Sequence, residues 1–147
     1  MSQKPLYDDS VSAAAFLPLE GYSAEATATP FTLTPAQMLS AQETFLASSG
    51  NAGAVAVTTP TAALMYTYLQ SLLAAQGIAT VNQINGSSFY LRIINNNTAS
   101  GIITLTGGTG CTINGTATIA ISTFRDYLIT ITGPSSYSLQ NVGSGTN

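Results

Sequence analysis

The chain has 147 residues, and only nine of them carry a formal charge: three Lys or Arg and six Asp or Glu, with no His. Charged residues are 6% of the sequence, against about 25% in an average soluble domain, and 21 Thr and 16 Ser take their place. Without His and with a single Cys, the usual acid–base and nucleophile sets cannot be assembled. We therefore expect a protein that is not an enzyme.

The same composition bears on ligands and partners. No cluster of Cys, His or carboxylate residues has the spacing of a metal site, and three cations in a chain of net charge −3 form no patch for phosphate groups. The segment Gly107-Gly108-Thr109-Gly110 resembles a phosphate-binding loop only in its glycine content. The most apolar run, 61–75, is too short and too polar to cross a bilayer. We expect no metal, no cofactor, no nucleic acid and no membrane partner.

The charges are unevenly distributed along the chain. Residues 1–30 carry Lys4 against Asp8, Asp9, Glu20 and Glu25, and so hold the whole net charge of −3. This boundary predicts an extended N-terminal arm over 1–28 and a β-rich body over 29–147. The arm has no sustained hydrophobic period, which is typical of a loose terminus, yet it has more large apolar residues than a solvated tail needs, which indicates an arm that docks on a neighbouring subunit. These residues are Leu6, Tyr7, Val11, Phe16, Leu17, Leu19 and Tyr22.

Two short strands, each followed by a helix signal, come next in the chain. Residues 31–33 alternate as in a strand, and Thr34-Pro35-Ala36-Gln37 is a capping box that predicts a helix to about residue 41. Residues 43–47 fit either state. Residues 55–57 predict a second strand, Thr58-Thr59 a cap, and Pro60 the start of an amphipathic helix over about 60–76, which Gly77 ends. Its apolar stripe is Leu64, Met65, Tyr68, Leu69, Leu72 and Leu73.

Everything after residue 78 has the pattern of strands. Five segments rich in β-branched and aromatic residues, separated by Gly and Asn turn signals, cover 88–95, 101–106, 116–121, 127–132 and 136–142. Their cadence is typical of an antiparallel β-sandwich or barrel, jelly-roll-like, and Asn114-Gly115 suits a two-residue hairpin. Alternation predicts one buried face in each strand. The predicted faces are Phe89, Leu91 and Ile93, then Ala117, Ile119 and Ile121, then Tyr127, Ile129 and Ile131.

The body has four charged side chains and one thiol as candidate site residues. Arg125 and Asp126 are adjacent, so they are read either as a solvated turn before residue 127 or as parts of inter-subunit polar contacts that also use Glu43 and Arg92. Cys111 is expected to be a small buried hydrophobic residue. Soluble proteins guard open strand edges with charge or Pro, and this body has almost no charge for that purpose. We therefore expect permanent assembly with identical subunits.

The segment 88–143 resembles a recurring C-terminal domain of virion surface proteins, chiefly of tailed phages and some large DNA viruses. Residues 89–95 fit its pattern F-x-x-x-I-x-N, residues 103–110 fit I-T-L-x-x-G-T-G, and residues 115–120 fit G-T-x-T-I-A. Residues 31–34 and 57–64 also fit what precedes that domain, so the likeness covers about 31–143 and leaves 1–28 outside.

The resemblance implies a non-enzymatic, typically trimeric β domain on the particle surface, made in the host cytoplasm. Within that class we expect a capsid decoration (cement) protein that stabilises the shell, with itself and the major capsid protein as partners. The alternatives are a tail-fibre, spike or head-fibre component that binds a host surface glycan, and a bacterial pilus-like subunit. The short chain, with one body and no shaft repeat, favours decoration.

Overall fold

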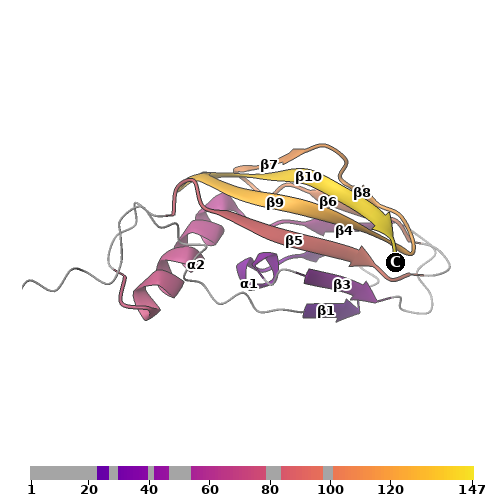
Figure 1. The fold of residues 1–147 in the computed structure, drawn as a ribbon, viewed down its shortest axis with the longest axis horizontal. Helices are drawn as coiled ribbons and strands as arrows, with labels where there is room; N and C mark the ends of the chain where they lie inside the picture. The colour runs from indigo at the N-terminus through magenta and orange to yellow at the C-terminus, as the bar shows by residue number, and fades with distance from the viewer. Residues whose placement is uncertain (1–22, 27–29, 40–41, 47–53, 79–83, 98–100) are drawn as a thin grey trace, which may run out of the picture.

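The computed structural model describes residues 23–26, 30–39, 42–46, 54–78, 84–97 and 101–147. These residues form ten strands in two sheets, together with two helices, so the prediction of a mainly β protein is confirmed. Figure 1 shows the long strands side by side, with helix α2 at one end of them and the C-terminus at the other.

The larger sheet has six strands. In spatial order they are β1 (Ser23–Ala26), β3 (Gln42–Leu46), β5 (Ser88–Asn95), β9 (Thr123–Gly133), β10 (Ser136–Thr146) and β7 (Cys111–Asn114). The three longest strands, β5, β9 and β10, pair antiparallel at its centre. The pairs β1–β3, β3–β5 and β10–β7 are parallel.

The smaller sheet has four strands. They are β2 (Phe31–Thr32), β4 (Val55–Thr58), β6 (Ile103–Thr106) and β8 (Thr118–Ile119). Strands β2, β4 and β6 are parallel, and β8 closes the sheet antiparallel to β6.

The prediction of antiparallel sheets was wrong, and the order of the strands gives the reason. Successive strands alternate between the two sheets along most of the chain, so the neighbours in one sheet are mostly every second strand, and many of them run parallel. Among the strands of the described ranges, only β9 and β10 follow one another within one sheet. For the same reason Asn114-Gly115 is not a hairpin turn: it leads from β7 in the larger sheet to β8 in the smaller one. Strand β7 itself was missed.

The first helix, α1 (Pro35–Met38), confirms the predicted capping box and is shorter than expected. The Gln37 amide donates to Thr34 Oγ1 at 3.2 Å, and the Thr34 amide donates to Gln37 Oε1 at 2.8 Å. The helix ends at a cap on Leu39, before the expected residue 41.

The second helix, α2 (Ala62–Ala75), ends as predicted and begins later than predicted. Its N-cap is Thr61, whose hydroxyl accepts from the Leu64 amide at 3.3 Å, and not Thr58 or Thr59. Gly77 has a φ of +75°. Its backbone amide donates to the Ala74 carbonyl, and the Ile78 amide donates to the Leu73 carbonyl. This is the Schellman geometry that the glycine predicted.

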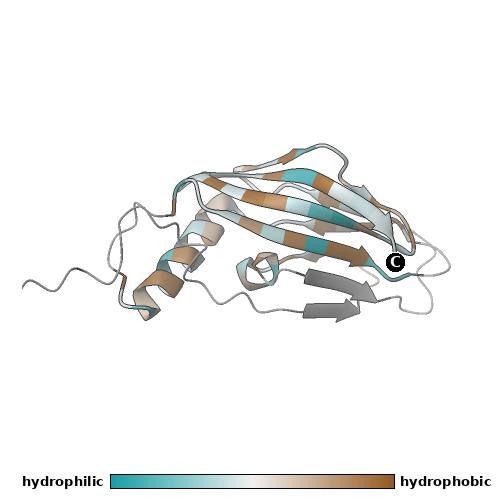
Figure 2. Ribbon diagram, viewed as in Figure 1, coloured by the Kyte–Doolittle hydropathy of each residue, from teal (hydrophilic) through white to brown (hydrophobic). Residues whose placement is uncertain are grey.

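The core lies between the two sheets and α2. The predicted faces of β5 and β9 are both buried, and Figure 2 shows hydrophobic and hydrophilic positions alternating along these strands. In α2 the buried residues are Ala62, Met65, Leu69 and Leu73. Leu64 was expected in the stripe but is 57% exposed, because the buried positions follow one another at intervals of three and four residues and leave it outside.

Burial around β7 and β8 is less complete than expected. Of the face predicted for 117–121, Ile119 is buried, Ala117 is half-buried and Ile121 is exposed. Strand β8 spans only two residues, so Ile121 lies beyond the sheet that would have covered it. Cys111 is half-buried, since it stands in β7 at the edge of the larger sheet.

Two buried polar side chains tie the layers together. The Tyr137 hydroxyl donates to the Pro60 carbonyl at 2.7 Å and contacts Thr59 Oγ1 at 2.9 Å. These contacts join β10 to the segment that precedes α2. Burial raises the pKa of Tyr137, which stays neutral there. Asn95, at the end of β5, donates to the Ile119 carbonyl at 3.1 Å in the smaller sheet. Thr59 is therefore occupied in the core, which is why it does not cap α2.

Strand β1 changes the expected boundary of the body. Residues 23–26 fall within the segment 1–28, which was expected to be an arm outside the body. They pair with β3 and form the edge of the larger sheet. The body therefore includes β1, and residues 1–22 lie outside the described part of the chain.

Candidate functional site: the outer face of the larger sheet

The side of β5, β9, β10 and β7 that points away from the core is here called the outer face. Its side chains form cross-strand rows, because residues paired on neighbouring strands point to the same side of the sheet. Ser88, Thr130, Ser138 and Thr112 form the first row, and Tyr90, Leu128, Gln140 and Asn114 the second. Arg92, Asp126 and Gly143 form the third row, and Ile94, Phe124 and Gly145 the fourth.

An ion pair lies in the middle of this face. Arg92 Nε donates to Asp126 Oδ1 at 2.7 Å and Arg92 Nη2 donates to Asp126 Oδ2 at 2.9 Å, a bidentate geometry between directly opposite residues. The guanidinium also lies 3.9 Å from the centre of the Phe124 ring, and Nη2 donates to the Tyr90 hydroxyl at 3.3 Å. Hydrogen bonds from Arg92 lower the pKa of Asp126, and the same bonds raise the pKa of Arg92.

Two glycines of β10 make room for this cluster. A Cβ atom at Gly145 would lie 2.7 Å from the Phe124 ring, and one at Gly143 would lie 3.2 Å from Asp126 Oδ2. The pairing of β9 with β10 shifts register between Asn141 and Gly143, and the Asn141 side chain donates to the Asp126 carbonyl at 3.3 Å. The glycines and the bulge hold the Phe124 ring and the Asp126 carboxylate against the sheet.

The outer face is therefore electrically neutral and partly apolar. Its charges neutralise each other, while Tyr90 is 42% exposed, Leu128 is 38% exposed and Val142, at the bulge, is 54% exposed. The remaining positions carry mainly hydroxyl or amide groups, and Ser88 and Thr130 share a hydrogen bond of 3.0 Å. Such a surface suits contact with another neutral protein surface and offers nothing to attract an ion or a phosphate.

The structure describes the side chains of three of the four predicted polar site residues. Arg92 and Asp126 pair within one chain, and the inter-subunit contacts expected of them stay a prediction. Arg125 lies in β9, so its interpretation as a solvated turn was wrong. Glu43 lies in β3, opposite Ile93, and its side chain is outside the described residues, as are all seven apolar residues predicted for attachment between Leu6 and Tyr22.

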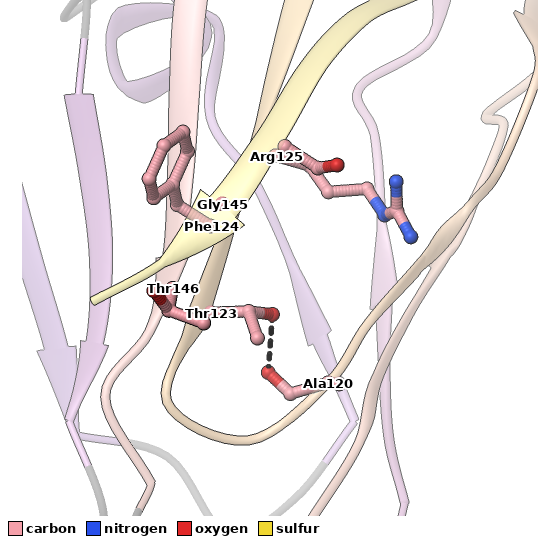
Figure 3. Close-up of a pocket in the computed structure, with 7 residues that line it drawn as sticks. Ala120, Thr123, Phe124, Arg125, Gly145 and Thr146 are labelled. Carbon is pink, nitrogen blue, oxygen red and sulfur yellow. Dashed lines mark hydrogen bonds between the residues drawn. The ribbon is translucent and has the colours of Figure 1, made fainter.

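Arg125 belongs to a cavity at the opposite side of β9. The cavity has a volume of about 220 Å³ and lies where β9 begins and β10 ends. Figure 3 shows Arg125 and Phe124 pointing to opposite sides of the strands, with the Thr123 hydroxyl bonded to the Ala120 carbonyl. Arg125 Nε donates to the Thr118 carbonyl at 2.6 Å. Sequence reasoning did not find this cavity, because its walls come from residues that are distant along the chain. Its lining is Ala120, Thr123, Phe124, Arg125, Ser144, Gly145 and Thr146.

The described residues offer no other chemistry of note. Within the ranges that the structure covers, no three His, Cys, Asp or Glu side chains gather to hold a metal ion. Neither α1 nor α2, the helices of those same ranges, has the length and apolar character of a transmembrane span.

Fold and site together define a mainly β protein of two mixed sheets with a neutral, partly apolar outer face. No protein family, no characterised protein and no solved structure matches the chain. Any functional conclusion therefore depends on the chain's own geometry and sequence.

The ion pair makes stability depend on pH. The folded protein lowers the pKa of Asp126, so this residue stabilises the fold above its unfolded pKa of about 4 and loses that contribution as the pH falls through the lower folded value. We expect Asp126→Asn to reduce the free energy of unfolding at pH 7 by about 1 kcal/mol, since solvent at the half-exposed Arg92 screens the pair. The difference between variant and wild type should shrink below pH 4.

Urea unfolding at several pH values measures this effect. The variants Arg92→Gln and Arg92→Gln/Asp126→Asn complete a double-mutant cycle that isolates the coupling between the two side chains. A difference between wild type and Asp126→Asn that stays constant down to pH 2 would show that the pair is not its source.

Proposed function

We propose that this protein is a structural protein of a virion surface, a capsid decoration protein that assembles as a homo-oligomer and stabilises the shell. The observation that carries the proposal is the neutral outer face. Among its described side chains the charged ones are Arg92 and Asp126, and they pair with each other. Exposed Tyr90, Leu128 and Val142 on such a face favour burial against a protein partner. The resemblance of residues 31–143 to virion surface domains supports the virion setting and the trimeric state.

An open strand edge supports the assembly part of the proposal. Strand β7 pairs only with residues 137–140 of β10, and no strand among the described residues pairs with 141–146 on that side. This stretch, Asn141-Val142-Gly143-Ser144-Gly145-Thr146, has no charge and no Pro to discourage strand addition. A permanent partner that covers the edge removes this liability. We further propose that the two sheets act as the layers of a β-sandwich, with the outer face turned to the neighbouring subunit.

The test has two measurements on the full chain. Native mass spectrometry of the purified protein at micromolar concentration should show an oligomer. The resemblance to virion surface domains makes a trimer the expected state. Antibody labelling of particles from the source should place many copies over the head. A stable monomer would refute the assembly, and the absence of label from purified particles would refute the virion setting.

A second candidate follows from one row of the outer face. Tyr90 shares its row with the amides of Gln140 and Asn114, a combination that suits a sugar ring and its hydroxyls. This arrangement favours a fibre or spike component that binds a host glycan. Few labelled copies at the tail or at single vertices, with glycan-array binding lost in Tyr90→Ala, would support this candidate over decoration.

A further inference from the structure

Arg125 is the cation of the described residues that has no carboxylate partner. Arg92 is bonded to both oxygens of Asp126, whereas Arg125 donates from Nε to the Thr118 carbonyl at 2.6 Å. That bond fixes the guanidinium at the wall of the 220 Å³ cavity and leaves its Nη donors for a ligand. A fixed guanidinium is the group that proteins use for planar, bidentate capture of a carboxylate.

The rest of the lining determines what kind of ligand fits. The hydroxyls of Ser144 and Thr146 line the same cavity and can donate to an anion. The Phe124 ring is not available for stacking. It points to the other side of the strands from Arg125 (Figure 3), where it packs against Gly145 and is covered by the Arg92 guanidinium. A cation with hydroxyls and without a free aromatic face favours a carboxylate over a sugar ring.

The chain itself supplies the carboxylates. Residues 31–147 have no net charge, whereas residues 1–30 carry −3. Strand β1 starts at Ser23, which shares one cross-strand row with Glu43, Ile93 and Arg125. Three strand spacings separate Ser23 from Arg125, about 14 Å at the usual distance between strands. An extended chain spans about 3.3 Å per residue, so the backbone before Ser23 reaches about 50 Å by Asp8, whereas it reaches about 10 Å by Glu20, whose side chain and that of Arg125 must span the rest.

We propose that the cavity at Arg125 binds a carboxylate of the acidic segment 1–22, supplied by Asp8, Asp9 or Glu20. The segment comes either from the same chain or from a second copy, and the chemistry at Arg125 is the same in both cases. This contact goes beyond the proposed function, because it fixes the N-terminal segment wherever the protein is located.

The test uses a full-length receptor whose own segment cannot compete. In the Asp8→Asn/Asp9→Asn/Glu20→Gln variant, here called the triple variant, the cavity is left without its proposed ligand, and a fluorescent peptide of residues 1–22 is added as the probe. We expect the wild-type peptide to bind, and binding to weaken by about tenfold when Arg125→Gln is added to the receptor. Arg125→Lys keeps the charge but loses the planar fork and the Nε–H bond to Thr118, so it is the matched control and should weaken binding less than Arg125→Gln does.

Several results would overturn the proposal. These are a peptide that does not bind, an affinity unchanged by Arg125→Gln, and equally tight binding of a peptide that carries the three substitutions of the triple variant. Binding of a sialic acid monosaccharide that depends on Arg125, without binding of the peptide, would assign the cavity to a glycan instead.

An NMR measurement on the native chain guards against a misfolded receptor. The ¹⁵N-edited Nε–H resonance of Arg125 should shift between wild type and the triple variant, whereas that of Arg92, which is held by Asp126, should not. Equal shifts at both arginines, or none at Arg125, would contradict the proposal. Mixing Arg125→Gln chains with triple-variant chains separates the two sources, because only a segment from a second copy can restore the Arg125 shift in the mixture.

Discussion

Replacement of Gly110 by Ala should destabilise the protein by about 3–5 kcal/mol, a large part of the 5–15 kcal/mol that holds a domain folded. Gly110 has a φ of +81°, which an L side chain rarely adopts. A Cβ atom there would also lie 2.3 Å from the Ser135 carbonyl and 2.7 Å from Ala62 Cβ. Its own carbonyl accepts from the Tyr137 amide at 3.0 Å, so the backbone cannot move away without loss of that bond.

Denaturant unfolding followed by circular dichroism measures this effect, and Gly86→Ala is its matched control. Gly86 has nearly the same φ, +84°, but a Cβ atom there would have nothing within 4 Å. The control should lose only the backbone contribution, about 1–2 kcal/mol. Equal losses in the two variants would show that the close approach at Gly110 does not matter.

Leu128→Lys should dissociate the proposed oligomer while leaving the subunit folded. Leu128 lies at the centre of the outer face and is 38% exposed, so a lysine side chain fits the isolated subunit without a clash. In an assembled face it would bury an unpaired charge, and we expect the dissociation constant to rise by about 100-fold or more.

Native mass spectrometry across a dilution series, with circular dichroism to verify the fold, measures the dissociation. Leu64→Lys is the control, since Leu64 is 57% exposed on α2 and lies off the outer face. An oligomer that persists in Leu128→Lys and falls apart in Leu64→Lys would move the interface from the outer face to the helix.

Local signals in the sequence predicted local structure well. The Thr34 cap with Gln37, the stop at Gly77 and the bounds of β5 all depend on residues within a few positions of one another. Strand β7 was missed because its four residues stand between two glycine turn signals and look like part of one long loop. Strands β9 and β10 run further than predicted, since Asp126, Gly143 and Gly145 have low strand preference and are held in the sheet by their neighbours.

Pairing between distant segments could not be predicted in this way. Nothing near Arg92 indicates that Asp126, 34 residues later, is its partner, and the alternation of strands between the sheets is visible only in three dimensions. The predicted apolar faces of β5 and β9 were correct because alternation is local, but alternation does not show which strands pair with them. The cavity at Arg125 has the same origin, with walls from β9, β10 and the turn before β9.

The alternation of strands also decides when the protein can fold during synthesis. On the ribosome β1 to β4 emerge first, yet β3 pairs with β5 and β5 pairs with β9, so the larger sheet has no centre until residues beyond Thr123 have left the exit tunnel. Until then the nascent chain exposes apolar strand segments, and it has few charges whose repulsion would oppose aggregation with other chains. Slow translation of the codons for β9 and β10 should therefore raise the demand for chaperones, and rapid synthesis of that part should lower it.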